Sequence, residues 1–132
     1  METAAERQTP YILLFVFYSI TTVMLYRTNY IDPIIQFIPL AAASTVLVVI
    51  PFNKHLKISA HMASSGSAIA YLFLIHFYAN YNMLLFITSA ILLAGIIASA
   101  RLYLKAHTIE EVYFGFIVGA FTTLLLGSFY LF

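Results

Sequence analysis

The sequence predicts an all-α integral membrane protein, built as a bundle of about five transmembrane helices. Composition is the first observation behind this prediction. Of 132 residues, 63% are hydrophobic and only 8% are charged, against roughly 25% charged residues in soluble domains, and the mean hydropathy is +0.97. The second observation is five apolar stretches, each near the roughly 20 residues with which an α-helix crosses a bilayer. Because their connections are short, we expect a single domain over residues 1–132.

The first two stretches run from about residue 11 to 26 and from about residue 34 to 52. Glu2 and Glu6 stand beside Arg7 ahead of the first stretch, and no small-residue cleavage pattern follows it. We therefore expect a retained helix rather than a signal peptide. Arg27 ends this stretch. The second stretch contains Pro39, which is tolerated where neighbouring helices or side chains satisfy the carbonyl that it leaves free.

The remaining stretches run from about 59 to 78, from 83 to 103 and from 108 to 132. Five crossings place the amino terminus and the loops 53–57 and 105–110 on one face of the membrane, and the carboxyl terminus on the other. Basic residues concentrate toward the first face, where five of the six lie: Arg7, Lys54, Lys57, Arg101 and Lys105. Because basic residues tend to stay inside, this distribution alone indicates a cytoplasmic face.

Charge and cysteine content exclude several classes of function. The net charge of +1 provides no clustered basic surface of the kind that binds nucleic acid. The chain contains no cysteine, which excludes disulfides, thiolate nucleophiles and cysteine-ligated metals.

Ionisable side chains gather on the first face, in a chain that carries almost none elsewhere. They include His55, His61, His107, Glu110 and Glu111. The third and fifth helices both begin on this face, so their free N–H groups and positive dipole ends favour an anion. Lys54, Lys57 and Arg101 add positive charge, and arginine presents a planar fork suited to phosphate oxygens. The pattern predicts an anion-binding site at the membrane boundary.

Two segments then resemble a known family. Arg101-x5-His107-x3-Glu111-Val112-x2-Gly115-x3-Gly119 resembles the third signature of the type 2 phosphatidic acid phosphatase superfamily, S-R-x5-H-x3-D, and the D-V-x2-G-x3-G that commonly continues it. Upstream, Ile58-Ser59-Ala60-His61 resembles the second signature, P-S-G-H. The resemblance extends over residues 54–119, the expected phosphatase-like core.

The chain departs from the family pattern at several points. Ile58 and Ala60 replace the proline and glycine of the second signature, Ala100 replaces the serine before the arginine, and Glu111 replaces the aspartate. The first signature, K-x6-R-P, is not present as such, and only Lys54 or Lys57 could replace its lysine. The six-helix core common in the family is shortened to five.

The resemblance implies an integral membrane phosphatase that removes phosphate from a lipid phosphomonoester or diphosphate without a metal or other cofactor. His107 would attack phosphorus and form a phosphohistidine. Glu111, four residues later on the same helix face, would orient His107. His61 would protonate the leaving group and later activate water.

The anion would be held by the remaining residues of the pattern, which are Arg101, one of Lys54 and Lys57, and the Ser59 hydroxyl, together with backbone amides. The lipid tail would lie between helices, and membrane lipids are the expected surroundings. The resemblance also implies a bacterial inner membrane with the site on the periplasmic side, opposite to the side that the basic residues indicate.

Simpler interpretations remain open for each residue. Thr108 and Glu111 also form a T-x-x-E capping box, and Ser59 is placed to cap the third helix. Arg101 and Lys105 could be snorkelling residues that end the fourth helix. His61 could be a solvated histidine at the interface.

Other polar and small residues have structural interpretations. Gly115-x3-Gly119 and the small residues 63–67 favour close helix packing. His76 is expected to hydrogen-bond to a neighbouring helix, and His55 to be a loop residue. At the level of function, two alternatives are an inactive phosphatase-like protein that binds lipid phosphate, and a metal site or ion pathway formed by His61, His107 and Glu111.

Overall fold

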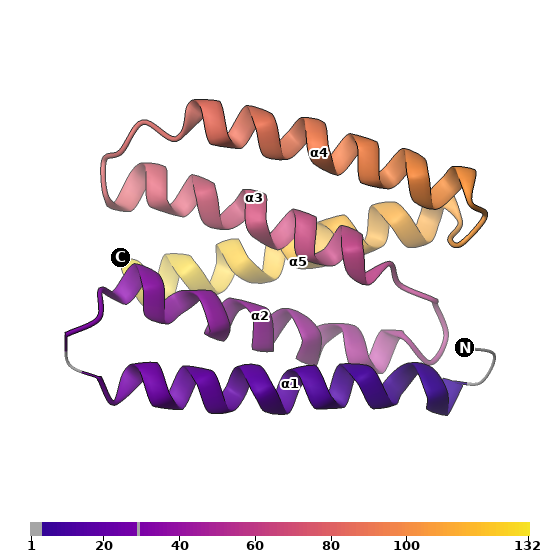
Figure 1. Ribbon diagram of the computed structural model, residues 1–132, viewed down its shortest axis with the longest axis horizontal. Helices are drawn as coiled ribbons and strands as arrows, with labels where there is room; N and C mark the ends of the chain where they lie inside the picture. The colour runs from indigo at the N-terminus through magenta and orange to yellow at the C-terminus, as the bar shows by residue number, and fades with distance from the viewer. Residues whose placement is uncertain (1–3, 29) are drawn as a thin grey trace.

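The structure is a computed structural model that describes residues 4–28 and 30–132, without the side chains of residues 4, 5 and 7. Of the predicted leader residues, Glu2 therefore lies outside the described residues, and Arg7 is described by its backbone alone. These residues form five α-helices in antiparallel succession (Figure 1). The bounds are Ala4–Tyr26 for α1, Pro33–Phe52 for α2, Ala60–Tyr78 for α3, Leu84–Tyr103 for α4 and Ile109–Leu131 for α5. The predicted all-α class and the five helices are confirmed.

Two details differ from the expectation. Helix α1 begins at Ala4, seven residues before the apolar stretch, and it continues through Pro10. Four helices, α1, α2, α4 and α5, are long and apolar enough to cross a membrane. Helix α3 is not among them, since it carries His61, three serines and His76 in 19 residues. Its length of about 28 Å still matches its neighbours.

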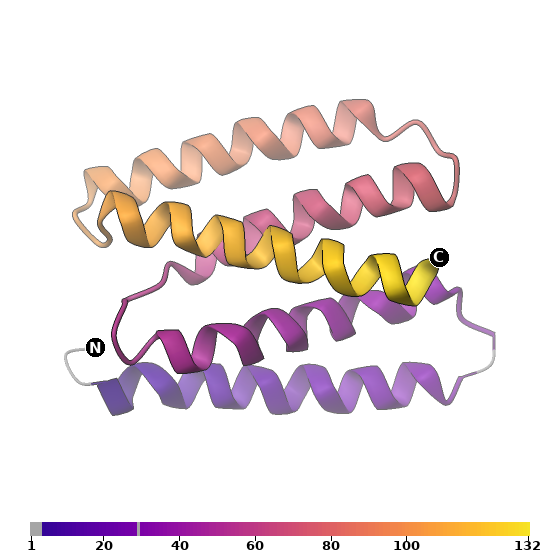
Figure 2. The ribbon, with the colours of Figure 1, turned by 180° about the vertical axis from the view of Figure 1, so that it is seen from behind.

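Helices α3 and α5 form the centre of the bundle, with α2 packed on α5 and α4 on α3. Figure 2 shows α5 running in front of α3 when the molecule is seen from behind. Their close approach depends on glycine. A Cβ at Gly119 would collide with the Ala63 carbonyl and one at Gly66 with the Phe116 carbonyl, whereas a Cβ at Gly115 would lie 2.8 Å from the Ser59 oxygen. The packing role predicted for Gly115-x3-Gly119 is confirmed.

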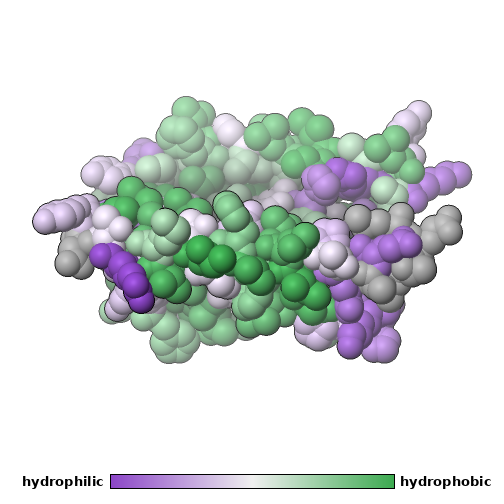
Figure 3. Space-filling view, turned by 60° about the horizontal axis from the view of Figure 1, so that its bottom comes forward, coloured by the Kyte–Doolittle hydropathy of each residue, from purple (hydrophilic) through white to green (hydrophobic). Residues whose placement is uncertain are grey.

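The outer surface of the helices is apolar. Leu13, Leu85, Leu92, Ile117 and Phe129 are each more than half exposed. Figure 3 shows the resulting hydrophobic surface between hydrophilic ends. A water-soluble monomer rarely exposes an apolar patch this extensive, and together with the four spanning helices it identifies an integral membrane protein.

The two ends of the bundle carry different segments. The amino end of α1, the α2–α3 connection and the α4–α5 turn lie at one end, on the right in Figure 1. The other connections and the carboxyl terminus lie at the opposite end, as the sequence predicts. His76 lies at that second end, in the last turn of α3. Its Nδ1 is 2.8 Å from the Tyr81 carbonyl oxygen and 3.3 Å from the Met83 nitrogen, so the predicted bond to a neighbouring helix is wrong and His76 instead fixes the α3–α4 connection.

Candidate active site

The turn between α4 and α5 explains the spacing of Arg101 and His107. The Ala106 N–H donates to the Arg101 carbonyl at 3.1 Å and the Lys105 N–H to the Leu102 carbonyl at 3.0 Å, which is the Schellman pattern of a helix end. Lys105 has the left-handed conformation that this pattern needs, with φ at 51°. Because α5 begins two residues after His107, the five intervening residues are the length of one capped turn between two helices.

His107 is held by two hydrogen-bond acceptors on one ring nitrogen. Its Nδ1 lies 2.9 Å from the Lys57 carbonyl oxygen and 3.0 Å from Glu111 Oε2. A carbonyl and a carboxylate oxygen can only accept, so Nδ1 carries the proton and donates to both. The neutral ring therefore keeps its free lone pair on Nε2, which is the atom available as a nucleophile. The side chains of His107 and Glu111 are 12% and 15% exposed, so the pair is largely shielded from water.

Glu111 has both of the roles that the sequence leaves open. The Thr108 N–H donates to Glu111 Oε2 at 3.1 Å, and the Glu111 N–H donates to the Thr108 hydroxyl at 3.3 Å, which completes the capping box. The same Oε2 accepts from His107. The capping box consequently fixes the carboxylate that orients the imidazole, and the longer glutamate side chain fits this arrangement.

The segment before α3 docks against the start of α5. The Ser59 N–H donates to the backbone carbonyl of Glu111 at 3.4 Å, two residues after Lys57 contacts His107. Ser59 is fully buried (0% exposed). Its side chain makes no capping hydrogen bond, so the capping interpretation is wrong, and its Oγ has no partner in the described part of the chain. A buried hydroxyl without a partner costs free energy unless a ligand or water completes it.

His61 lies in the first turn of α3, at the same end of the bundle and outside the four membrane-spanning helices. Partial burial, the Arg101 guanidinium and the His107 ring, in that order of effect, lower the pKa of His61 below its ordinary value of 6.5. The structure thus brings His61 within electrostatic reach of both Arg101 and His107, although they come from separate segments.

The two candidate lysines are placed differently from the histidines. Lys54 and Lys57 are both exposed on the α2–α3 connection, and the contact from Lys57 to His107 is made by its backbone carbonyl. The structure therefore assigns Lys57 a backbone contact with His107. His55, on the same connection, is an exposed loop residue, as predicted.

The structure gives no support to the metal-site alternative. Within residues 4–28 and 30–132, no group of three or more His, Asp or Glu side chains is placed to hold a metal ion. His61 and Glu111 act on His107 through charge and a hydrogen bond instead.

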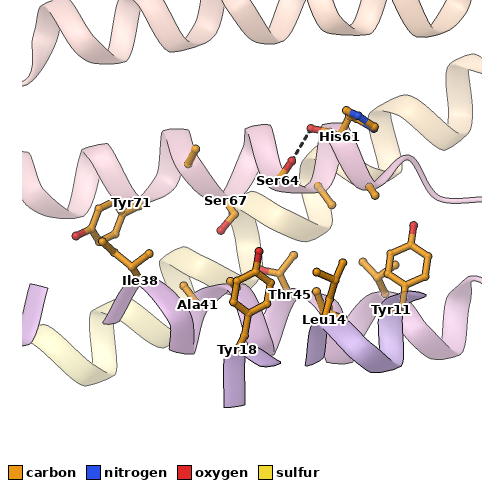
Figure 4. Close-up of a pocket in the computed structure, with 16 residues that line it drawn as sticks. Tyr11, Leu14, Tyr18, Ile38, Ala41, Thr45, His61, Ser64, Ser67 and Tyr71 are labelled. Atoms are coloured by element: carbon orange, nitrogen blue, oxygen red, sulfur yellow. Dashed lines mark hydrogen bonds between the residues drawn. The ribbon is translucent and has the colours of Figure 1, made fainter. Parts of the chain in front are cut away.

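A cleft that the sequence did not indicate lies beside the site. It has a volume of about 480 Å³ and is lined by α1, α2 and α3, including Tyr11, Tyr18, Thr45, His61, Ser67 and Tyr71. We call it the α1–α3 cleft. Figure 4 shows that it reaches from His61 in the first turn of α3 to Tyr71, with the His61 ring turned away from α1. Among the described residues, Thr45 Oγ1 is buried without a hydrogen-bond partner.

Comparison with known proteins agrees with this geometry. A sequence profile described as the PAP2 superfamily matches residues 50–131, more than half of the chain. The chain belongs to this superfamily. No significant match was found among curated proteins or among solved structures.

The region matched to the PAP2 superfamily begins in the last turn of α2 and contains α3, α4 and α5. It includes every predicted site residue, namely Lys54, Lys57, Ser59, His61, Arg101, His107 and Glu111. Membership implies phosphatase activity on phosphate esters. Helix α1 and most of α2 lie outside the matched region.

Proposed function

We propose that this protein hydrolyses a phosphomonoester or diphosphate on a membrane lipid through a phosphohistidine on His107, without a metal. The hydrogen bonds of His107 are the observation that carries the proposal. Because Lys57 and Glu111 both accept from Nδ1, Nε2 keeps the lone pair that nucleophilic catalysis requires. The acceptor pair also stabilises the positive ring that forms on attack.

In the first step, His107 Nε2 attacks phosphorus, a P–N bond forms and the bond from phosphorus to the leaving oxygen breaks. His61 gives its proton to that oxygen, so the lipid leaves as an alcohol, or as a phosphate if the substrate is a diphosphate. A bound phosphate anion favours protonated His61 and so opposes the lowering of its pKa by Arg101 and His107.

In the second step, neutral His61 takes a proton from water as the water oxygen attacks phosphorus. The P–N bond breaks, inorganic phosphate leaves and His107 is restored. Negative charge on the phosphoryl oxygens is stabilised by Arg101, by Lys54 or Lys57, by the Ser59 hydroxyl and by free N–H groups at the start of α3. The unpaired Ser59 Oγ supports this role, since an anion would supply the partner that it lacks.

The test is phosphate release by the purified protein in detergent from phosphatidic acid, with EDTA present. We expect release to continue in EDTA and to be abolished by His107→Ala. His55→Ala is the matched control, because it removes a histidine from an exposed position on the connection that contacts His107, and we expect it to retain activity. Loss of release in EDTA would reverse the metal-independent mechanism. Tight binding of lipid phosphates without release of phosphate from any of them would establish the inactive, lipid-binding alternative.

We further propose that the site lies on the periplasmic side of a bacterial inner membrane. The superfamily match supports a phosphatase, and such an enzyme would retain basic residues that bind the phosphate group. Retention of Lys54, Lys57 and Arg101 for that purpose accounts for the basic residues at the site end without a cytoplasmic location.

A further inference from the structure

The α1–α3 cleft contains a polar atom that the bundle itself does not use. Thr45 is 5% exposed, and its Oγ1 has no hydrogen-bond partner in the part of the chain that the structure describes. Threonines in membrane helices usually donate to a carbonyl one turn earlier, as the Thr22 hydroxyl does to the Tyr18 carbonyl at 2.8 Å. A buried hydroxyl that makes no such bond has a desolvation cost that only a ligand or a water can offset.

The surroundings of Thr45 indicate the kind of ligand. Leu14, Ile38, Ala41, Val46 and Val49 line the cleft beside it. Figure 4 shows Thr45 on the α2 wall, across the cleft from the α3 segment that carries Ser64 and Ser67. The Ser64 hydroxyl already donates to the His61 carbonyl at 3.0 Å, and Ser67 pairs with Thr123 at 2.6 Å. Of the hydroxyls on the α2 and α3 walls, Thr45 is therefore the one left to donate to a ligand, and the Tyr18 hydroxyl of α1 also lines the cleft.

The position of the cleft relates the ligand to the reaction site. Ala60 and His61, in the first turn of α3, line one end of the cleft. Ser64 and Ser67 are three and six residues further along, which corresponds to about 5 and 9 Å of helix. Tyr71 lines the opposite end, fixed by a 2.8 Å hydrogen bond from its hydroxyl to the Ile34 carbonyl. Because the His61 ring is turned away from α1 (Figure 4), a lipid whose phosphate lies at His61 would pass around the first turn of α3 for the start of its tail to lie beside Thr45.

We infer that the α1–α3 cleft binds an acyl chain of an ester-linked lipid phosphate, with the Thr45 hydroxyl donating to an ester carbonyl oxygen. This inference rests on the proposed lipid phosphatase function and makes Thr45 a specificity-determining residue. The glycerol backbone carries its ester carbonyls only a few bonds from the phosphate. A polyprenyl chain has no oxygen acceptor beyond its phosphates and would leave Thr45 unpaired.

The experiment compares two phosphatidic acids with the same chain lengths, one ester-linked and one ether-linked, the second lacking the carbonyl oxygens. We expect the protein to have a KM about fivefold lower for the ester lipid, the scale of one hydrogen bond. Thr45→Val should raise KM for the ester lipid to the ether value and change kcat by less than about twofold. Thr45→Ser, which keeps the hydroxyl, should retain the preference. Thr88→Val is the control on α4, where the hydroxyl donates to the Leu84 carbonyl.

We expect Thr45→Val to fold, because replacing an unpaired buried hydroxyl by a methyl group of the same shape is neutral or stabilising. Binding of both lipids to His107→Ala, with and without Thr45→Val, separates this inference from the proposed function. If binding is selective for the ester lipid and depends on Thr45, but the unmodified protein releases no phosphate, the proposed phosphatase activity would be overturned and the role of Thr45 would stand. Equal affinity for the two lipids, or an equal loss for both on Thr45→Val, would overturn the role of Thr45.

Discussion

At the scale of single residues, the orientation of His107 is the feature on which the chemistry depends. Its reactive tautomer is set by two oxygens from different parts of the chain, the Lys57 carbonyl and the Glu111 carboxylate. The same carboxylate completes the cap of α5 by accepting from the Thr108 N–H. One side chain thus supports both the helix start and the His107 ring, the proposed nucleophile, and the two roles can be separated by measurement.

Glu111→Gln tests this separation. The amide can still accept from the Thr108 N–H, so we expect the free energy of unfolding to fall by no more than about 1 kcal/mol, from the lost charge at the helix start. Turnover should fall at least about a hundredfold, because a neutral amide stabilises the positive imidazole poorly and can impose the wrong tautomer.

Glu110→Gln is the matched control for Glu111→Gln. It removes the same charge from the same helical turn at an exposed position, and turnover should change less than about twofold. A fall in turnover no larger than the loss of stability explains would assign Glu111 to the cap alone.

At the scale of elements, the site is assembled by the contact between α3 and α5. Gly115 and Gly119 allow the α5 backbone to approach Ser59 and Ala63 at the start of α3. This approach brings the first turn of α3, with His61, to the start of α5, which follows His107 directly.

Gly119→Ala should therefore reduce activity more than tenfold and destabilise the protein by about 1–3 kcal/mol, since its Cβ collides with the Ala63 carbonyl and overpacking carries that cost. Gly95→Ala on α4 is the control, because nothing lies within 4 Å of a Cβ there. This control should retain activity and gain up to about 1 kcal/mol of helix stability. Phosphate release and thermal unfolding in detergent measure both effects, and an active, stable Gly119→Ala protein would contradict the role of the contact.

The sequence predicts the five helices and the contact between α3 and α5 well, but it does not predict the hydrogen bonding of individual hydroxyl groups. Apart from the start of α1, the helix bounds follow from apolar length, the end of the bundle at which each connection lies follows from alternation of the helices, and the Gly115-x3-Gly119 contact follows from small-residue spacing. The missing hydrogen bond of the Ser59 hydroxyl could not be predicted, because a serine directly before a helix matches the capping pattern whichever way its hydroxyl points. The unpaired hydroxyl of Thr45 could not be predicted either. In the sequence, Thr45 is a threonine within an apolar stretch like Thr88, whose hydroxyl bonds within its own helix.

At the scale of the whole molecule, we predict that all five helices cross the membrane and that the two ends of the bundle lie on opposite sides of it. This depends on α3, the helix that is less apolar than the other four. One of its polar side chains, Ser67, pairs with Thr123 of α5. The buried Gly66 also packs against α5. Because Ser67 and Gly66 pack against α5, part of the polar surface of α3 is covered by protein, which favours a crossing despite its lower hydropathy.

Labelling of single cysteines tests this topology, since the chain has none of its own. His55→Cys lies at the site end and Tyr81→Cys at the other, both at exposed positions. We expect an impermeant maleimide to label His55→Cys in intact cells and Tyr81→Cys only after the membrane is opened. Labelling of both from one side would show that α3 does not cross. The reverse pattern would place the site in the cytoplasm.

The α1–α3 cleft is formed partly by the region matched to the PAP2 superfamily and partly by helices outside it. Its α3 wall belongs to the region matched to the PAP2 superfamily, which also carries the proposed nucleophile and its partners, whereas α1 and most of α2 fall outside that region. Helix α1 packs on α2 and makes no comparable contact with α4 or α5 within the described residues. On the inferred role of the cleft, choice of lipid and bond cleavage are separable properties in this architecture. The amino-terminal hairpin can diverge to admit new tails while the reacting groups stay in register.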